Sequence, residues 1–355
     1  MPSAQQSPDS KSAPRQAEFG WPGGDRPGEL RFEYDVDAEL GAALGGVLEA
    51  EIGAPREIRA LTRPDGAIGR YAVTGGDGRE WFVRVSARWG EPELEQAITG
   101  YLREGGLAVN HLVAAGLRMA WSGETLRVDI RERVRGRHFD GSMEDLRALA
   151  RTLADCHRML RSFPEAAQVR ELTARRFARL EEIQARMNEE LLRGNFGFFC
   201  QDAAWARAHA EWLAALVEGF RARSELLPGS QCLHGQIHQA NILYAPGPVL
   251  VDWEEAVQTY APVQWDLAYF VQRFCLHDSP PHAVVRARLE AVRDAYGMPL
   301  GELCGMMRHV AWLSAVILVG YRQAGIESPL AEYGKFVRLE EQARGLGTLL
   351  EEFAA

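Results

Sequence analysis

The chain has 355 residues, of which 46% are hydrophobic and 25% charged, and its formal net charge is −9. This length and composition are those of a soluble globular protein with a large core and two lobes or domains. The negative net charge argues against a nucleic-acid partner and against an anionic membrane surface.

The cysteines and the N-terminus indicate a cytoplasmic protein. Residues 1–30 are rich in Ser, Pro, Gln and Gly and lack an apolar run, which predicts a disordered tail and not a signal peptide. The longest apolar run, 310–321, is too short to span a bilayer, so we expect it to be a buried helix. The cysteines are scattered and odd in number, which is typical of reduced thiols and not of disulfides or zinc: Cys156, Cys200, Cys232, Cys275 and Cys304.

The first half of the chain predicts mainly strands. Alternating apolar residues bounded by Pro, Gly and Asp turns predict strands, and one amphipathic stretch that ends at Gly-Gly predicts a helix. The expected strands cover 57–63, 70–75, 80–86, 112–121 and 125–134, with the helix at 91–104.

After Gly136 the pattern becomes helical. An amphipathic helix over 142–160 is expected to begin at a Ser142 cap. Further helices are expected at about 169–193, 203–224, 283–296, 301–324 and 328–352. Only a hairpin at 241–252 interrupts them, so the chain is predicted to be α+β, with a small β-rich lobe followed by a large helical one.

The hairpin has polar residues at its open end. If the four residues 245–248 form its turn, Tyr244 lies opposite Val249, and Asn241 lies opposite Asp252. An amide oxygen beside a carboxylate would suit Mg²⁺, which prefers hard oxygen ligands. Alternatively, the two side chains only cap the ends of the strands.

The segment before the hairpin reads "HGQIH" and supplies His234 and His238. Two histidines at this spacing are also consistent with a zinc site. Such pairs usually lie on a helix, whereas this segment leads directly into a strand, so the zinc interpretation is the weaker one.

The stretch "HGQIHQANIL", followed by "VLVDWE" and then "WDLA", resembles the aminoglycoside phosphotransferase and choline kinase-like family, whose fold is related to that of protein kinases. The matching residues are His234, Gly235, Gln236, His238, Asn241, Asp252, Trp253, Glu254, Asp266, Leu267 and Ala268. The resemblance is specific over 231–270 and looser elsewhere.

The resemblance implies a protein kinase-like two-lobe fold, with an antiparallel β-rich N-lobe over 31–135 and a mainly helical C-lobe over 136–355. The C-lobe would carry the catalytic hairpin, 233–254, and a substrate-side helical insert, 165–225. In this arrangement the nucleotide binds between the two lobes.

The same resemblance assigns roles in the C-lobe. Asn241 and Asp252 would hold Mg²⁺, His234 would brace the catalytic loop, and Asp266 would anchor it. Gln236 stands where the family has its catalytic aspartate.

In the N-lobe, the resemblance makes Arg84 the strand cation that contacts the nucleotide phosphates, paired with the helix glutamate Glu95. The backbone of Glu132 and Val134 would meet the adenine edge, and 62–70 would form the loop over the phosphates. An arginine at position 84 is consistent with the composition, because only two of the 40 basic residues are lysines.

Gln236 is the main departure from the family pattern, because an amide cannot take a proton at neutral pH. Phosphoryl transfer depends mainly on positioning and on charge stabilisation, so activity without this base is physically possible. We therefore expect an ATP- or GTP-dependent, Mg²⁺-dependent phosphotransferase that acts on a hydroxyl of a small molecule or a peptide natural product. A pseudokinase that binds nucleotide or ligand without efficient turnover, or an engineered inactive form, remains the alternative.

Overall fold

The computed structural model describes residues 15–17, 31–62, 64–88, 90–220, 229–276 and 280–353. The chain divides into two compact units. Unit 1 consists of Met1–Gln96 and Asn110–His138, and unit 2 consists of Ala97–Val109 and Phe139–Ala355.

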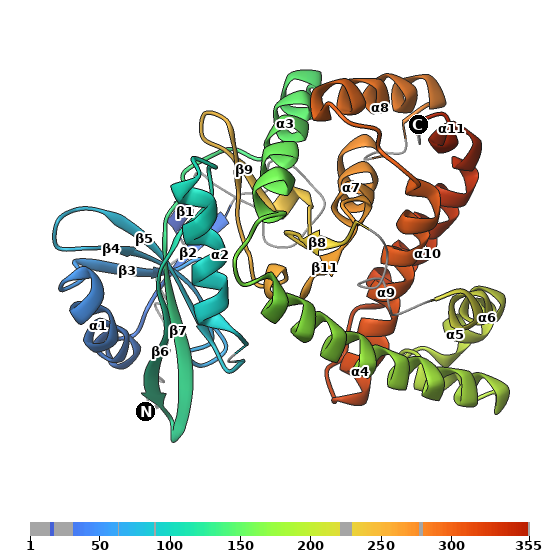
Figure 1. Ribbon diagram of the computed structural model, residues 1–355. Coiled ribbons are helices and arrows are strands. Elements are labelled where there is room, and N and C mark those ends of the chain that lie inside the picture. Colours follow the sequence, from blue (N-terminus) through green and yellow to red (C-terminus); the bar gives the residue numbers. More distant parts are fainter. Residues whose placement is uncertain are drawn as a thin grey trace, which may run out of the picture. The chain divides into compact units, whose positions relative to one another are not determined.

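Within the described residues, unit 1 is built on one antiparallel sheet of seven strands in the order β1-β2-β3-β4-β5-β7-β6 (Figure 1). The strands are β1 (Arg15–Ala17), β2 (Arg31–Asp35), β3 (Glu57–Ala60), β4 (Gly69–Thr74), β5 (Glu80–Ser86), β6 (Leu112–Trp121) and β7 (Glu124–Glu132). The strands expected from alternation are therefore confirmed. Strand β1 is the only described part of the expected tail, and the rest of that tail lies outside the described residues.

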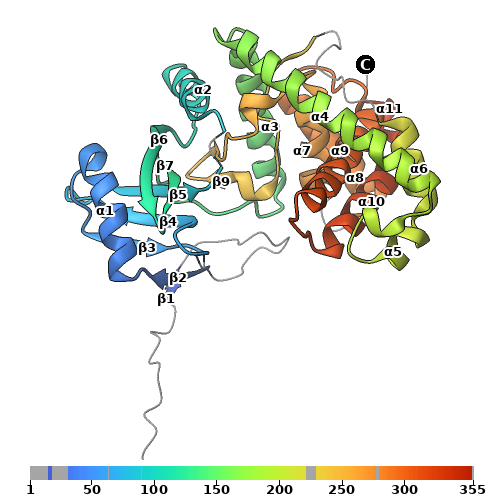
Figure 2. The ribbon, with the colours of Figure 1, turned by 90° about the horizontal axis from the view of Figure 1, so that it is seen from below.

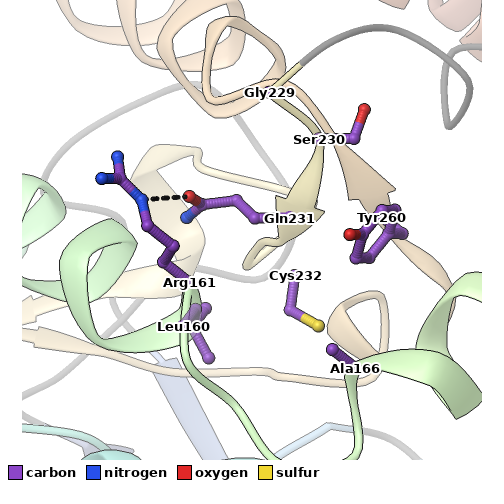
Figure 3. A pocket seen from close by; sticks show the side chains of 8 residues that line it. All are labelled: Leu160, Arg161, Ala166, Gly229, Ser230, Gln231, Cys232 and Tyr260. Carbon is purple, nitrogen blue, oxygen red and sulfur yellow. Dashed lines mark hydrogen bonds between the residues drawn. The ribbon is translucent and has the colours of Figure 1, made fainter.

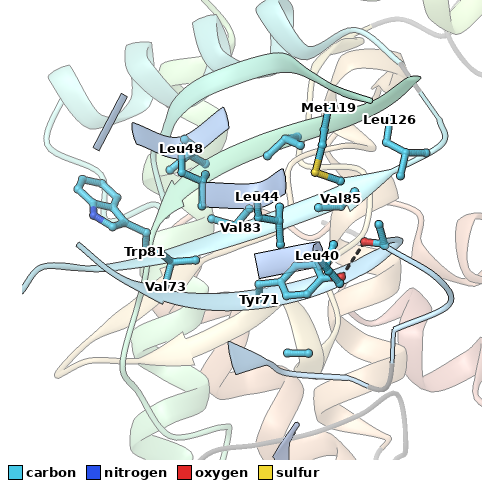
Figure 4. Packing of buried hydrophobic residues seen from close by; sticks show 14 of the residues in the cluster. Leu40, Leu44, Leu48, Tyr71, Val73, Trp81, Val83, Val85, Met119 and Leu126 are labelled. Atoms are coloured by element: carbon cyan, nitrogen blue, oxygen red, sulfur yellow. Dashed lines mark hydrogen bonds between the residues drawn. The ribbon is translucent and has the colours of Figure 1, made fainter. Parts of the chain in front are cut away.

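One face of this sheet carries the apolar core of unit 1. Helix α1 (Ala38–Ile52) begins at Asp37, whose side chain accepts a bond from the Leu40 amide at 2.8 Å. Its leucines recur every fourth residue, so Leu40, Leu44 and Leu48 share one side of the helix. They pack on buried strand residues, of which Figure 4 labels Tyr71, Val73, Trp81, Val83, Val85, Met119 and Leu126. Val128 and Ile130 of β7 belong to the same cluster.

The other face of the sheet is charged. Along β5, Trp81, Val83 and Val85 are buried toward α1, so Arg84 points to the opposite face. The first turns of helix α2 (Pro92–Glu104) lie over that opposite face, because Glu95 bonds to Arg131 of β7. The expected helix at 91–104 is thus confirmed.

Unit 2 is mainly helical (Figures 1 and 2). Its helices are α3 (Met143–Leu160), α4 (Ala166–Leu192), α5 (Ala203–Ala208), α6 (Ala210–Gly219), α7 (Gln264–Phe270), α8 (His282–Tyr296), α9 (Leu303–Gln323), α10 (Leu330–Gly345) and α11 (Gly347–Glu351). The predicted cap of α3 is confirmed, because the Ser142 hydroxyl accepts a bond from the Asp145 amide at 3.1 Å. The expected α+β class is confirmed as well.

Two helices expected to be continuous are interrupted. The helix expected over 203–224 is split between α5 and α6, because His209 has a non-helical backbone (φ −107°, ψ 23°), and residues 221–224 lie outside the described residues. The helix expected over 328–352 is likewise divided into α10 and α11 at Leu346. In contrast, α3, α8 and α9 begin and end within two residues of their expected bounds.

Helix α9 contains the longest apolar run of the chain. By length and composition it is apolar enough to cross a membrane, but half of its most apolar stretch is buried inside the protein. Val310, Ala311 and Leu313 are among its buried residues, and Arg308 pairs with Glu340 of α10 at 2.7 Å. This is the pattern of a core helix, as expected.

Residues 97–109 belong to unit 2, although the expected lobe boundary placed them in the first lobe. Two contacts explain this. The Tyr101 ring packs against Phe163 with centroids 5.5 Å apart, and the amide of Leu250 donates to the Ala108 carbonyl at 3.1 Å.

Candidate active site

The motif loop of unit 2 connects strand β8 (Gln231–Cys232) to the hairpin of β9 (Ile242–Tyr244) and β10 (Pro248–Leu250). A buried carboxylate holds it in place. Asp266, at the start of α7, is 0% exposed and accepts the backbone amides of His234 at 3.0 Å and Gly235 at 2.9 Å, one on each oxygen. Asp266 therefore anchors this loop through its backbone, which is the role that the sequence resemblance implied.

A second chain of bonds fixes Asp266 itself. His157 of α3 places Nε2 3.2 Å from Asp266 Oδ2 and Nδ1 2.7 Å from the Tyr296 hydroxyl. A carboxylate only accepts, so Nε2 carries a proton and donates it to Asp266. Burial raises the pKa of Tyr296, which keeps its hydroxyl able to donate. Neither His157 nor Tyr296 was singled out from the sequence.

Gly235 allows the loop to turn. Its φ of +87° lies in the left-handed region, and a Cβ there would come within 2.4 Å of Thr259 Oγ1. Its carbonyl accepts a bond from Trp265 Nε1 at 3.2 Å. Only glycine satisfies both the backbone angle and the space at this position.

His234 braces the loop against the hairpin. Its Nε2 donates to the Val251 carbonyl at 3.2 Å, and its Nδ1 accepts the Gln236 amide at 3.4 Å. Its ring lies on Trp253, with centroids 4.5 Å apart. Burial lowers the pKa of His234, so the ring is neutral at pH 7, as these two bonds require.

These contacts disfavour the zinc interpretation. Both ring nitrogens of His234 already have partners. Over the described ranges, no group of three or more His, Cys, Asp or Glu side chains is arranged to hold a metal ion.

The hairpin register differs from the expected one. Pro248 lies opposite Tyr244, so the turn between the strands has three residues. Asn241 lies opposite Val251, and its backbone carbonyl accepts a bond from the Val251 amide at 2.9 Å. The prediction that Asn241 directly faces Asp252 is therefore wrong by one residue. The physical reason is that Pro248 begins a strand, where its missing N–H is tolerated, and does not complete the turn.

Asn241 nevertheless presents an oxygen at this end of the hairpin. Its Nδ2 donates to the Gln236 carbonyl at 3.1 Å and approaches Gln236 Oε1 at 3.5 Å. Because the nitrogen is directed at the motif loop, Oδ1 is the atom that can ligate a cation. Gln236 itself is half-buried, beside Asn241.

Asp252 follows directly on the residue that bonds to Asn241, and its backbone has a φ of +64°. A non-glycine residue in the left-handed region costs free energy and persists only where the surroundings impose it. Such residues often belong to functional sites. The strained backbone thus singles out the same carboxylate that the sequence motif does.

In unit 1, Arg84 lies on the charged face of the sheet. It is half-buried on β5, opposite Arg70 of β4 and Asp129 of β7 in the strand register. Opposed residues of antiparallel strands share a face, so the three side chains form one row. The expected loop of 62–70 is a tight turn in which Asp65 and Ile68 exchange two backbone bonds of 3.0 Å, and Arg63 lies outside the described residues.

Glu95 lies on the same face, where two arginines that sequence reasoning missed bind it. Arg131 Nη2 donates to Glu95 Oε1 at 2.5 Å, and Arg127 Nη2 lies 3.5 Å from Glu95 Oε2. Arg127 also binds Asp129 through Nε at 2.8 Å. The sequence does contain a signal for Arg127 and Arg131. Both alternate with Val128 and Ile130 along β7, which places the two arginines on the face opposite the core.

The strand that carries these arginines ends at Glu132, whose amide donates to the His111 carbonyl at 3.1 Å. Val134 follows it and is half-buried. The contact of Glu132 and Val134 with an adenine stays a prediction.

A cavity of about 210 Å³ lies next to β8 in unit 2 (Figure 3). Within it, Arg161 Nε donates to Gln231 Oε1 at 3.4 Å. The other lining residues are Leu160, Ala166, Gly229, Ser230, Cys232 and Tyr260. None of the residues expected to bind nucleotide or metal is among them, so this cavity is not the candidate site.

Comparisons with known proteins bear on the fold. The amicoumacin kinase hAmiN, in complex with AMP-PNP, Ca²⁺ and Ami, is 12% identical, with a TM-score of 0.55 over 87% of this chain and 96% of that one. The AMP-bound spectinomycin phosphotransferase APH(9)-Ia is 14% identical, with a TM-score of 0.53 over 85% and 98%. The GDP and kanamycin complex of APH(2")-IIia is 13% identical, with a TM-score of 0.51 over 84% and 97%.

At these identities the likeness shows the fold, which is the kinase-like fold of the aminoglycoside phosphotransferases. No curated protein sequence matches the chain. The family model described as the phosphotransferase enzyme family, APH, matches residues 60–299, which is well over half of the sequence. The chain therefore belongs to the phosphotransferase enzyme family.

Proposed function

We propose that this protein is a nucleoside triphosphate- and Mg²⁺-dependent phosphotransferase whose acceptor is a hydroxyl of a small molecule or a peptide natural product. The observation that carries the proposal is the end of the hairpin. The backbone carbonyl of Asn241 accepts a bond from the Val251 amide, and the residue after Val251, Asp252, has a φ of +64°. The backbones of Asn241, which carries an amide oxygen, and of Asp252, which carries a carboxylate, are thus held within one strand position of each other.

The donor set at this end of the hairpin fits Mg²⁺. The ion prefers oxygen ligands and takes one or two from protein, with water and phosphate oxygens completing its shell. Asn241 Oδ1 and the Asp252 carboxylate would hold it. When bound, the ion supplies positive charge that stabilises the transferring phosphoryl group.

Other residues would position the acceptor hydroxyl and the phosphates. Gln236 would hydrogen-bond the acceptor hydroxyl and orient it, because an amide can position a hydroxyl but cannot take its proton at neutral pH. His234 and Asp266 would keep Gln236 in place through the backbone bonds of the loop. Arg84 would contact the phosphates from the charged face of unit 1, in the role that the family pattern implies.

The nucleotide is ATP or GTP in this proposal. The related structures contain AMP-PNP, AMP or GDP, which supports a purine nucleotide without deciding between the two bases. The cysteines are all free thiols, which supports the expected cytoplasmic location.

Gln236 also favours a second candidate function, a pseudokinase that binds nucleotide or ligand without efficient turnover. The loss of a general base typically lowers a rate by about 10²–10⁴-fold. This candidate binds nucleotide or another ligand and differs from the first in its lack of efficient turnover.

The metal site can be tested with Asp252→Ala. Calorimetry with ATP or GTP should show Mg²⁺-dependent binding to the wild type and none to the variant, because the charged ligand has been removed. Asp294→Ala is the matched control, because this carboxylate is exposed and pairs with Arg293 at the surface. Equal nucleotide affinity with and without the Asp252 carboxylate would refute the proposed site. Turnover is then measured as phosphate transfer across a panel of hydroxyl acceptors.

A further inference from the structure

The cavity beside β8 lies outside the candidate active site and has no role in the proposed function. Its walls come from the end of α3 (Leu160 and Arg161), the start of α4 (Ala166), residues 229–232, and β11 (Tyr260–Ala261). Its volume of about 210 Å³ is several times the roughly 30 Å³ that one water molecule takes up in the liquid. It is smaller than the roughly 300–1,000 Å³ of pockets for drug-sized ligands, so its size suits a small organic molecule.

Hydrogen bonds hold the walls of this cavity in place. Cys232 of β8 pairs with Tyr260 of β11 in the strand register, and the Tyr260 amide donates to Thr173 Oγ1 of α4 at 3.0 Å. Gln231 is 5% exposed, and its Nε2 donates to the His157 carbonyl of α3 at 2.6 Å. The cavity is therefore formed without a ligand, as small-molecule sites usually are.

Arg161 is the only charged residue among the described residues that line the cavity. Figure 3 shows its side chain extending toward Gln231, and its Nε donates to Gln231 Oε1 at 3.4 Å. Its Nη1 and Nη2 have no acceptor among the residues that the structure describes. Arg161 is also exposed, so a ligand can reach this end of the guanidinium from solvent.

The other walls are neutral and largely apolar. Leu160 and Ala166 contribute aliphatic carbons, and Tyr260 contributes a ring with one hydroxyl. Burial raises the pKa of the Cys232 thiol to about 12, so the thiol carries no charge at pH 7. One positive group beside apolar walls suits a ligand that has one negative charge and a short apolar part.

The geometry of the arginine favours a carboxylate. Because Gln231 occupies Nε, the guanidinium can offer a ligand its two terminal nitrogens. These nitrogens match the two oxygens of a carboxylate in a bidentate pair, which is stronger and more specific than a single charged hydrogen bond.

We propose that this cavity is a binding site for a small monocarboxylate. The carboxylate binds Nη1 and Nη2 of Arg161, and the apolar part of the ligand contacts Leu160, Ala166 and Tyr260. The site shares no residue with the proposed phosphotransferase site, so the two proposals can fail independently.

Butyrate is the probe for this site, and butyramide is its neutral counterpart of similar shape. In a ligand-observed NMR titration of the full chain, butyrate should bind saturably, and butyramide should bind at least about tenfold more weakly, because it cannot form the charged pair. No saturable binding of butyrate, or equal binding of the two, would overturn the proposal. Inorganic phosphate should bind more weakly than butyrate, because it has no apolar part. Phosphate binding as tight as that of butyrate would overturn the assignment to a carboxylate.

Arg161→Met removes the cation and retains an extended side chain, so butyrate binding should weaken by at least about tenfold. Arg158→Met is the matched control, because Arg158 lies in the last turn of α3 and pairs with Asp155 at the surface at 2.8 Å. The control should bind butyrate as the wild type does. Equal affinities in the two variants would mean that Arg161 does not hold the carboxylate.

Ala166→Phe tests the cavity apart from the arginine. The larger side chain would fill the space and leave Arg161 and Gln231 unchanged, so butyrate binding should be lost. If thermal unfolding shows that this variant does not fold, Ala166→Leu replaces it. Retained binding in the folded variant would mean that butyrate pairs with an exposed arginine and not with the cavity, which would overturn the proposal.

Asp252→Ala separates this inference from the proposed function. It should bind butyrate as the wild type does, whatever its effect on nucleotide binding. A loss of butyrate binding in this variant would place the carboxylate at the candidate active site and overturn the inference. Mg²⁺-dependent nucleotide binding that survives in the same variant would overturn the proposed metal site and leave the cavity unaffected.

Discussion

Glu95 in unit 1 and Asp266 in unit 2 are both buried carboxylates, but the protein stabilises them in different ways. Glu95 is bound by the guanidinium groups of Arg131 and Arg127. Asp266 accepts two backbone amides and the imidazole of His157. Glu95 is compensated by charged side chains, whereas Asp266 is compensated by two main-chain amides and an imidazole.

The difference indicates what each region controls. Arginine side chains set the local balance of charge, so the arrangement around Glu95 determines how its buried charge is compensated. Backbone amides set the path of the chain, so the arrangement around Asp266 determines the shape of the motif loop. The shape of that loop consequently should not depend on whether residue 236 carries a charge.

Gln236→Asp should have the largest effect, which is on the rate of phosphate transfer. It tests whether the shape of the motif loop is independent of the charge at residue 236. If the loop keeps its shape, the new carboxylate faces the acceptor hydroxyl, and phosphate transfer or nucleotide hydrolysis should rise by up to about 10²–10⁴-fold. Phosphate release from ATP and GTP with Mg²⁺ measures it, and Gln168→Asp on the exposed surface of α4 is the control. A large rise would favour the pseudokinase for the native protein. A fall from measurable wild-type turnover would mean that Gln236 itself is the working positioning group.

Asp266→Asn breaks the backbone arrangement directly. An amide retains one acceptor oxygen but turns an NH₂ group toward an N–H or toward His157, so buried donors lose their acceptor. We expect the free energy of unfolding to fall by about 3–5 kcal/mol, the range for breaking one side of a buried charged network. Urea unfolding measures it, with Asp294→Asn at the surface expected to change it by less than about 0.5 kcal/mol. A similarly small loss for Asp266→Asn would show that the loop is held by other contacts.

Gly235→Ala tests the same loop without changing any charge. The φ of +87° strains an alanine, and its Cβ would lie 2.4 Å from Thr259 Oγ1. Strain of this kind costs about 1–3 kcal/mol, which thermal or urea unfolding would record. Gly247→Ala in the hairpin turn is the control, because a Cβ there meets nothing within 4 Å. If the two alanine variants are equally stable, the backbone bonds to Asp266 do not fix the shape of the loop.

The smallest expected effect is a dependence of stability on pH in unit 2. Burial lowers the pKa of His309, which stacks on Phe220, to about 4. Between this value and the unfolded value of about 6.5, only the unfolded state binds the proton, so stability falls as pH falls through that window. The slope from His309 is at most about 1.4 kcal/mol per pH unit. His309→Phe should remove this part of the slope in urea unfolding between pH 4 and 6.5, whereas His282→Gln at the surface should not.

Local patterns in the sequence were sufficient for most elements. The alternation of apolar residues predicted β5 and β6 with their observed bounds, because half-buried strands must alternate. The Ser142 cap and the apolar period after it predicted α3. Helix α1 was missed, since three of its fifteen residues are glycines, which lower helix propensity, and packing against the sheet stabilises it instead.

The motif residues were also predictable, but their geometry was not. Short-range spacing was enough to single out His234, Gln236, Asn241 and Asp252. The register of the hairpin was predicted wrongly, because it depends on whether Pro248 ends the turn or begins a strand, and both are locally allowed.

The sequence by itself therefore determined the class of the fold, the motif and the substitution of Gln236, all of which are encoded within short segments. Tertiary structure alone decided what surrounds each buried charge. Glu95 meets Arg131 across 36 residues and Asp266 meets His157 across 109. No local period constrains such pairs, because the partners are selected by the requirement that a buried carboxylate be compensated wherever the chain folds it.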